Sequence, residues 1–382
     1  MTSERREPYR NGRIRVAVIF GGQSDEHDVS LRSAQTVMSA LDPAKYEVIP
    51  VGITRDGRWL AGGDPFHQLA AQSPLFALPE STRSEQTTAN GEIVANGVVA
   101  ASTPGALSTV FSDQLDVVFP VLHGPMGEDG TVQGFLELAG VPYVGAGVLG
   151  SAVAMDKAIA KELLARAGLP QAPWITVRRV EWERDPEGVA RRVAEQLGYP
   201  CFTKPANLGS SVGITKVHGP EELGEGMRTA ARLDRKIVIE RGIDARELEI
   251  SVLGNEDPIA SVAGEIVPCN EFYDYSAKYV DDRSQLIIPA DIPASLMEKV
   301  RELAIAAYRA LDLAGMARVD FFLERGTDQL YVNEVNTIPG FTAISMYPKL
   351  WEASGIPLPE LVDRLIALAL ERHATKNGAV AH

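Results

Sequence analysis

The 382-residue chain has only two cysteines, Cys201 and Cys269, which are too few for a disulfide framework. They also lack the repeated spacing of a structural zinc site, so they indicate free thiols in a reducing compartment. No stretch approaches the roughly 18 consecutive apolar residues that span a bilayer. The first thirteen residues are polar and lack the apolar centre of a secretory signal. We therefore expect a cytoplasmic protein with no membrane partner.

Positive charge is also scarce. Lys and Arg number 37 against 51 Asp and Glu, which gives a formal net charge of -14. A chain this acidic repels a phosphate backbone, and no run of Lys or Arg supplies a basic patch, so a nucleic-acid partner is not expected. The 45% hydrophobic content at this length predicts a large buried core divided between two or three domains.

The N-terminal part has the pattern of an α/β domain. Residues 14–20, IRVAVIF, form a continuous β-branched run that is typical of a strand buried on both faces. Helical spacing follows from about residue 28 to 41, and the order strand, loop, helix, strand recurs from residue 115. This order predicts a doubly wound domain with a parallel sheet over residues 1–146.

Three other segments complete the predicted organisation. Residues 61–113 are rich in small and polar residues and are expected to form an insertion with a hairpin around Asn90-Gly91 and Asn96-Gly97. A central domain of mixed helices and strands is expected over residues 147–243, beginning with a helix at about 154–167. Residues 244–382 are expected to form a C-terminal α+β domain that carries a metal site.

Two predicted strands near the C-terminal end are joined by five residues, RGTDQ, and indicate a β-hairpin. Counting back from that loop places Asp320 opposite Glu334 and Arg318 opposite Asn336 on one face. The same register pairs Glu324 with Leu330 and Phe322 with Val332. The other face, which we expect to pack in the core, holds Val319, Phe321, Tyr331 and Val335.

Like charges that face each other across a sheet are destabilising, so another group must offset Asp320 and Glu334. One interpretation is an Mg²⁺ (or Mn²⁺) site, since two carboxylates and the amide oxygen of Asn336 suit a hard cation. The alternative is a solvated sheet face on which Arg318 alone neutralises the pair. The glycine-containing segment that follows, with Ser345, offers backbone N–H groups and a hydroxyl for a carboxylate, which favours a site.

Several single positions have two interpretations. Lys204 precedes GSSVG at residues 209–213, which lacks the Walker pattern but whose glycines allow close approach to phosphate; an ordinary turn is the alternative. Lys157 is either solvated or faces phosphate. Glu240 and Glu247 are either surface charges or carboxylates for a nucleoside.

The first strand is followed by GGQSDEHDVS, at the place where open α/β sheets bind ligands. The segment lacks G-x-G-x-x-G, so a dinucleotide site is not expected. Glu26 either favours the helix start through the helix dipole or holds a substrate ammonium group. His123, in HGPMGEDG, is either a loop histidine or a donor that faces the substrate.

Taken together, these motifs resemble those of the D-alanine:D-alanine ligases of the ATP-grasp superfamily. The resemblance is carried, in order along nearly the whole chain, by GGQSDEHDVS, HGPMGEDGTVQGFLELAGVPYVGAG, MDK, KPANLGSSVGITKV, YDYSAKY, ARVDFF and NEVNTIPGFTAISMYP. It implies a three-domain ATP-grasp fold with ATP between the second and third domains. It also implies a homodimer that joins two D-alanines through an acyl phosphate, for peptidoglycan synthesis.

The resemblance further implies roles for individual residues. The metal ligands would be Asp320, Glu334 and Asn336. The ATP-binding residues would be Lys157, Lys204, Ser210, Ser211, Glu240, Glu247 and Lys278. The substrate-binding residues would be Glu26, His123, Ser345 and Met346. The catalytic residues would be Glu26, Ser210, Tyr279, Arg318 and Gly340.

Tyr279 favours D-alanine over D-lactate as the acceptor within this family pattern, and the GSSVG and YDYSAKY segments are expected to be mobile loops that close over ATP. Two other functions stay open at this point. One is a nucleotide-binding module that kept the fold and lost catalysis. The other is a related ligase that uses D-lactate or another acceptor.

Overall fold

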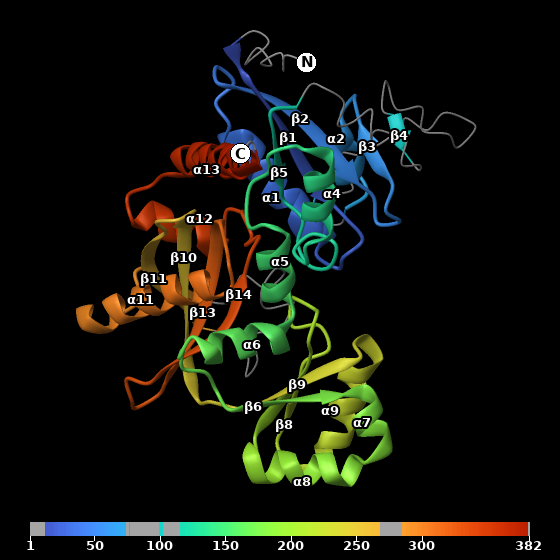
Figure 1. Ribbon diagram of the computed structural model, residues 1–382, viewed down its shortest axis with the longest axis vertical. Coiled ribbons are helices and arrows are strands. Elements are labelled where there is room, and N and C mark those ends of the chain that lie inside the picture. The colour runs from blue at the N-terminus through green and yellow to red at the C-terminus, as the bar shows by residue number, and fades with distance from the viewer. Residues whose placement is uncertain (1–11, 74–75, 77–98, 102–114, 268–284, 381–382) are drawn as a thin grey trace, which may run out of the picture.

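The protein is described by a computed structural model that covers residues 12–73, 76, 99–101, 115–267 and 285–380. Its strands form three sheets (Figure 1). The N-terminal sheet lies at one end of the long axis, the four-stranded sheet lies at the other end, and the C-terminal sheet lies between them. Within the described ranges, no helix is long and apolar enough to cross a membrane.

The N-terminal sheet has the strand order β4-β3-β2-β1-β5. Its strands are β1 (Ile14–Gly21), β2 (Tyr46–Ile53), β3 (Trp59–Ala61), β4 (Val99–Ala101) and β5 (Val117–Pro120). β1 pairs in parallel with β2 and β5, which confirms the expected parallel centre, whereas β3 and β4 extend one edge in antiparallel fashion. The hairpin predicted near Asn90-Gly91 lies outside the described residues.

Helices cover both faces of this sheet, which explains the continuous apolar run of β1. The helices are α1 (His27–Ala40), α2 (Pro65–Ala70), α4 (Thr131–Ala139) and α13 (Leu358–Val380). Val16, Val18 and Phe20 share one core with α1 and α13. Ala17 and Ile19 point to the other face and share a core with α4. Successive residues of β1 are therefore buried on opposite sides.

The four-stranded sheet is antiparallel, with the order β6-β9-β7-β8. Its strands are β6 (Trp174–Arg178), β7 (Cys201–Pro205), β8 (Thr215–Val217) and β9 (Lys236–Arg241). Helices α7 (Arg179–Arg184), α8 (Pro186–Gln196) and α9 (Pro220–Leu233) accompany it. The free Cys201 is fully buried in the core of this sheet, and burial raises the pKa of its thiol to about 11.

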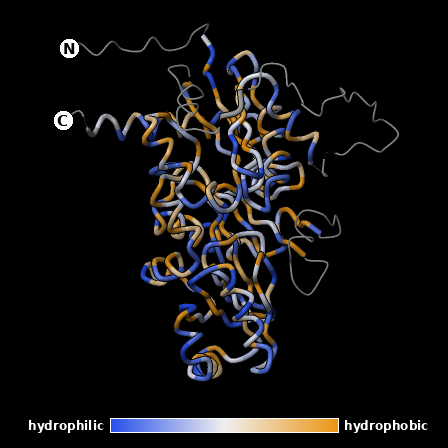
Figure 2. The backbone as a smooth tube through the Cα atoms, turned by 90° about the vertical axis from the view of Figure 1, so that its right-hand side faces the viewer, coloured by the Kyte–Doolittle hydropathy of each residue, from blue (hydrophilic) through white to orange (hydrophobic). Residues whose placement is uncertain are grey.

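The C-terminal sheet is also antiparallel, with the order β12-β11-β10-β13-β14. Its strands are β10 (Ala245–Gly254), β11 (Ile259–Val267), β12 (Gln285–Ile287), β13 (Gly315–Glu324) and β14 (Leu330–Asn336). Helices α5 (Val148–Met155), α6 (Lys157–Arg166) and α11 (Ala294–Ala310) share its core, and α12 (Met346–Ala353) contacts β10 and β11. Figure 2 shows hydrophobic and hydrophilic residues alternating along outer helices, as expected for helices with one buried side.

The single helix predicted over about 154–167 is wrong, because α5 ends at Met155 and α6 begins at Lys157. Asp156 separates them with an extended backbone, and its side chain accepts a hydrogen bond from the Ile159 N–H, 3.2 Å away. An Asp at this position caps the second helix. Since α5 and α6 share a core with the C-terminal sheet, the predicted domain boundaries at residues 146 and 243 stay predictions.

The β13–β14 register confirms half of the predicted pairs. Asp320 pairs with Glu334, and Arg318 pairs with Asn336. Beyond Asp320 the register shifts by one residue because Asn333 forms a bulge, so the predicted pairs Phe322–Val332 and Glu324–Leu330 are wrong. The observed pairs are Phe321–Val332, Phe322–Tyr331 and Leu323–Leu330. Tyr331 therefore lies on the polar face and Val332 packs in the core, because a bulge inverts the alternation that we counted.

The C-terminal helix α13 packs against the N-terminal sheet although it lies at the opposite end of the sequence (Figure 1). Asp363 accepts hydrogen bonds from the Tyr46 hydroxyl at 2.8 Å and the Lys45 ammonium at 2.5 Å. The Arg372 guanidinium donates to the carbonyl oxygens of Gly145 at 2.8 Å and Tyr143 at 3.1 Å. It also lies 4.3 Å from the centroid of the Tyr143 ring. These contacts fix the last helix on the first domain.

We predict that Arg372→Ala lowers the free energy of unfolding by about 2 kcal/mol, because it removes two hydrogen bonds from a charged donor and a cation–π contact. The matched control is Arg364→Ala on the same helix, whose partner Glu360 is exposed. This control should cost less than about 0.5 kcal/mol. Urea unfolding of both variants measures the difference, and equal losses would contradict the assigned role of Arg372.

Candidate active site

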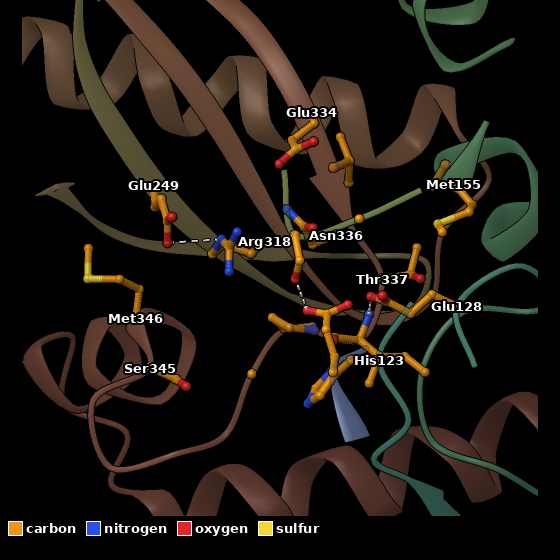
Figure 3. A pocket seen from close by; sticks show the side chains of 18 of the residues that line it. His123, Glu128, Met155, Glu249, Arg318, Glu334, Asn336, Thr337, Ser345 and Met346 are labelled. Carbon is orange, nitrogen blue, oxygen red and sulfur yellow. Dashed lines mark hydrogen bonds and ion pairs between the residues drawn. The ribbon is translucent and has the colours of Figure 1, made fainter. Parts of the chain in front are cut away.

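The first of two adjoining cavities lies where the N-terminal domain, the GSSVG turn and the C-terminal sheet meet (Figure 3). Predicted site residues from all three regions line it. They are Glu26, His123, Lys157, Ser210, Arg318, Glu334, Asn336, Gly340, Ser345 and Met346. The structure therefore brings the predicted substrate-binding residues together with most of the predicted catalytic residues.

The second cavity lies between the four-stranded sheet and the C-terminal sheet. The predicted site residues that line it are Lys204, Ser211, Glu240, Glu247, Asp320 and Glu334. Glu249 and Glu334 line both cavities, so the two spaces meet along the polar face of β10, β13 and β14. Lys278 and Tyr279 lie outside the described residues.

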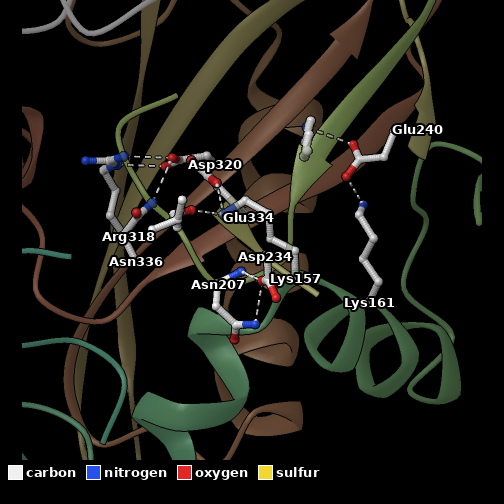
Figure 4. A network of polar contacts seen from close by, with 11 residues as sticks. Lys157, Lys161, Asn207, Asp234, Glu240, Arg318, Asp320, Glu334 and Asn336 are labelled. Carbon is white, nitrogen blue, oxygen red and sulfur yellow. Dashed lines mark hydrogen bonds and ion pairs between the residues drawn. The ribbon is translucent and has the colours of Figure 1, made fainter. Parts of the chain in front are cut away.

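A row of three carboxylates separates the two cavities. Glu249 on β10 pairs with Asp320 on β13, and Asp320 pairs with Glu334 on β14. The Arg318 Nε lies 2.7 Å from the Asp320 Oδ1 and 2.9 Å from the Glu249 Oε2 (Figures 3 and 4). The Lys157 ammonium lies 3.8 Å from Glu334. Arg318 thus offsets part of the repulsion, and Lys157 lies beside Glu334 as a second cation.

The same row has the donor chemistry of a hard-cation site. Asp320, Glu334 and Asn336 present carboxylate and amide groups on one face, and the Asn336 Nδ2 donates to Asp320 at 2.9 Å. Such oxygen donors are those that Mg²⁺ and Mn²⁺ prefer. However, no group of three or more His, Cys, Asp or Glu side chains in the described ranges is arranged to hold a metal ion. The donor types fit a divalent cation, and the site itself stays a prediction.

Glu240 is not a surface charge. It is buried, and its carboxylate lies 3.0 Å from the Lys204 ammonium and 3.3 Å from that of Lys161 (Figure 4). Burial opposes ionisation of Glu240, but the two lysines outweigh it and lower the pKa of the carboxyl group. Burial lowers the pKa of Lys161. The carboxylate therefore holds Lys204 at the wall of the second cavity.

The GSSVG turn contacts the N-terminal domain instead of forming an isolated turn. The Ser210 hydroxyl donates a hydrogen bond to the Glu26 carboxylate. Ser210 and Ser211 both have left-handed backbone conformations, with φ of 50° and 61°. Non-glycine residues adopt this conformation only when their surroundings impose it. The contact joins residues that the sequence pattern assigned to a substrate ammonium site and a phosphate loop.

The segment between β14 and α12 is shaped by one short-range contact. The Ser345 hydroxyl lies 3.0 Å from the Thr342 N–H and 2.7 Å from the Thr342 hydroxyl. A Cβ at position 340 would lie 2.7 Å from the Ser345 Oγ, which is too close without a shift. A side chain at position 340 would therefore require the Ser345 hydroxyl to shift, and the backbone of Gly340 lies at the first cavity.

His123 is buried, and both of its ring nitrogens have protein partners. The Nδ1 atom lies 3.0 Å from the Ile338 carbonyl oxygen, and the Nε2 atom lies 3.2 Å from the Ser33 hydroxyl. Burial lowers the pKa of this imidazole, which favours the neutral ring. A neutral imidazole has only one N–H donor. The carbonyl oxygen of Ile338 is the acceptor for that donor.

Comparison with known proteins agrees with this arrangement. Family profiles described as "D-ala D-ala ligase N-terminus" and "D-ala D-ala ligase C-terminus" match residues 15–146 and 163–367. The chain belongs to the D-alanine–D-alanine ligase family. A relative named D-alanine--D-alanine ligase, from Thermoanaerobacter sp. (strain X514), is 54% identical over 370 residues, covering 95% of this chain and 98% of the relative.

Two solved structures of the family superimpose on nearly the whole chain. The D-alanine-D-alanine ligase from Coxiella burnetii has a TM-score of 0.78 and 37% identity, covering 97% of both chains. The VanG D-Ala:D-Ser ligase from Enterococcus faecalis has a TM-score of 0.76 and 35% identity, covering 94% of this chain and 99% of that one. The predicted ATP-grasp fold is confirmed.

Sequence reasoning missed several polar residues of this ligase site. Glu249 lies two residues after Glu247, so strand alternation could have placed it on the same face. Lys161 follows Lys157 by one helical turn, which the helix period could have shown. Glu128 lies in HGPMGEDG and lines the first cavity, where burial and the Glu26 charge raise its pKa to about 8. No sequence signal distinguished it from its acidic neighbours.

We predict that Glu240→Gln destabilises the protein by about 3 to 5 kcal/mol, because it leaves two buried ammonium groups without their carboxylate. The variant should also bind ATP more weakly, since Lys204 loses its support. Glu225→Gln, which breaks an exposed pair with Arg228, is the matched control and should cost less than about 0.5 kcal/mol. Urea unfolding and ATP titration measure both effects; unchanged stability would exclude the buried triad.

Proposed function

We propose that this enzyme uses ATP to join two D-alanines into D-alanyl-D-alanine, through an acyl phosphate, for peptidoglycan synthesis. The observation that carries the proposal is the 54% identity to a D-alanine--D-alanine ligase over 95% of the chain. The geometry is consistent with it, since a cavity between two sheets adjoins a second cavity along one row of carboxylates. A nucleotide in one space would face an amino acid in the other.

In this proposal, the first cavity takes the amino acids. Glu26, supported by the Ser210 hydroxyl, holds the ammonium group of the first D-alanine. Arg318 and the Gly340 N–H face its carboxylate. Ser345 and Met346, at the start of α12, receive the carboxylate of the second D-alanine.

The second cavity takes ATP in the same proposal. Lys204 and Ser211, which line this cavity, face the phosphates, and Lys157 approaches them from the first cavity beside Glu334. The family resemblance adds Lys278, which lies outside the described residues. Glu240 and Glu247 lie on the nucleoside side. The family resemblance assigns Tyr279, which also lies outside the described residues, to the amino acids. Asp320, Glu334 and Asn336 would hold Mg²⁺ (or Mn²⁺), which would supply positive charge to offset that of the phosphates.

The residues of the chain suit the chemistry of both steps. A carboxylate is a poor acyl donor, so phosphorylation by ATP must come before attack by the second amine. Negative charge develops on oxygen atoms in each step, and Arg318 is already held in place by Glu249 and Asp320. A cation that is fixed before reaction stabilises this charge without reorganisation.

A cytoplasmic location and a homodimer are further parts of the proposal. Both rest on the family resemblance. Light scattering of the purified protein would measure the dimer, and fractionation of cells would locate the enzyme.

The direct test is ADP release with ATP, Mg²⁺ and D-alanine, followed by the mass of the product. We expect release that depends on D-alanine and a product with the mass of the dipeptide. D-serine and D-lactate are supplied as competing acceptors. Absence of amino-acid-dependent ADP release would refute the ligase activity. If the main product joined D-alanine to D-serine or D-lactate, D-alanine would not be the preferred second substrate.

We predict that Asp320→Asn lowers kcat by about 100-fold or more, because the charge row loses the group that fixes Arg318 and binds the cation. Glu324→Gln, on the same strand but outside both cavities, is the matched control and should keep near-normal turnover. A near-normal kcat for Asp320→Asn at saturating Mg²⁺ would contradict the role of Asp320.

A further inference from the structure

The backbone of Ile338 is held at both its N–H and its carbonyl oxygen by side chains of the N-terminal domain. Its N–H donates to the Glu128 Oε1 at 3.2 Å, and its carbonyl oxygen lies 3.0 Å from the His123 Nδ1. Three residues later, the Phe341 N–H donates to the Ser33 hydroxyl at 3.1 Å. Figure 3 shows His123 and Glu128 beside the segment that follows Asn336 and Thr337.

These contacts form one consistent chain of hydrogen bonds. Because the Ser33 oxygen accepts from Phe341, its own hydrogen can be donated to the His123 Nε2, 3.2 Å away. The ring then carries its proton on Nδ1 and donates it to Ile338. The other Glu128 oxygen accepts from the Gly124 N–H at 2.7 Å, which anchors that carboxyl group to its own loop.

The three side chains come from rigid or anchored parts of one domain. Ser33 lies on α1 and is fully buried, and His123 is 5% exposed. Both therefore make their hydrogen bonds away from bulk water, where such bonds are costly to lose. The segment that they hold belongs to the C-terminal domain, between β14 and α12.

We propose that Ser33, His123 and Glu128 are positioning residues that fix the 338–341 segment, so that the Gly340 N–H stays directed at the reacting carboxylate. This inference rests on the proposed function, which gives Gly340 its role. Gly340 lies between the two residues that are held, Ile338 and Phe341. In this assignment His123 acts through the backbone and does not bind the substrate itself.

A positioning role has a kinetic signature. None of the three side chains lines the second cavity, so ATP affinity should not depend on them. A displacement of a backbone donor by about 1 Å can lower a rate by about 100-fold, because alignment at the reacting atoms is lost. Loss of one contact of the chain should therefore lower kcat and leave ATP binding intact.

The first variant is Ser33→Ala, with Ser151→Ala as the matched control. Ser151 is also fully buried on a helix, and its hydroxyl makes no hydrogen bond with the residues that the structure describes. We expect Ser33→Ala to lower kcat about 10-fold, with ATP affinity close to that of Ser151→Ala. Its unfolding midpoint should be lower than that of Ser151→Ala, because the Phe341 N–H loses its buried acceptor. Equal kcat values for the two variants would overturn the inference.

The second variants, His123→Asn and His123→Leu, keep the test decisive if Ser33→Ala folds poorly. Asn retains an N–H donor near the Nδ1 position, so it should preserve several-fold more kcat than Leu. Unchanged kcat with a raised KM for D-alanine in His123→Asn would indicate direct substrate binding and overturn the positioning role. The wild-type enzyme is assayed in parallel: inactive wild type refutes the proposed function, whereas active wild type with unaffected variants refutes this inference alone.

Discussion

The site depends on the balance of charge along three neighbouring strands. Glu249, Asp320 and Glu334 lie in one row, and Arg318 contacts two of them. Carboxylates this close repel one another, so the row is stable only with cations beside it. The carboxylates hold Arg318 in place through its ion pairs. They also attract further cations to the region where the two cavities adjoin. Substrate phosphates and protein carboxylates can then share the same cations.

Much of this site followed from the sequence, since strand alternation and a short loop are local properties. The opposition of Asp320 and Glu334 was predicted from the hairpin register and is observed. The prediction failed past Asn333, because a bulge is set by tertiary packing rather than by the alternating pattern. The break at Asp156 was missed for a similar reason, since a capping residue also resembles an ordinary exposed helix position.

Contacts between distant segments were beyond sequence reasoning. Glu240 was open to a surface interpretation until the structure placed Lys161 and Lys204 on either side of it. Likewise, the link from Ser33 through His123 to Ile338 joins residues more than two hundred positions apart in the chain. Contacts between distant residues arise when domains pack together, and the local pattern of residue types along the sequence does not reveal them. The sequence therefore indicated which residues matter more readily than how they hold one another.

The attachment of α13 to the N-terminal sheet has a consequence for how the protein is made. One face of that sheet is completed by the last helix, whose Leu365 and Ile366 share a core with Val16 and Phe20. During translation, the first strand is synthesised more than three hundred residues before this helix. Until α13 is synthesised, the apolar face of the N-terminal sheet that α13 covers stays exposed. Exposed apolar surface of this kind promotes aggregation and is bound by chaperones. The first core can therefore close only after α13 has been synthesised.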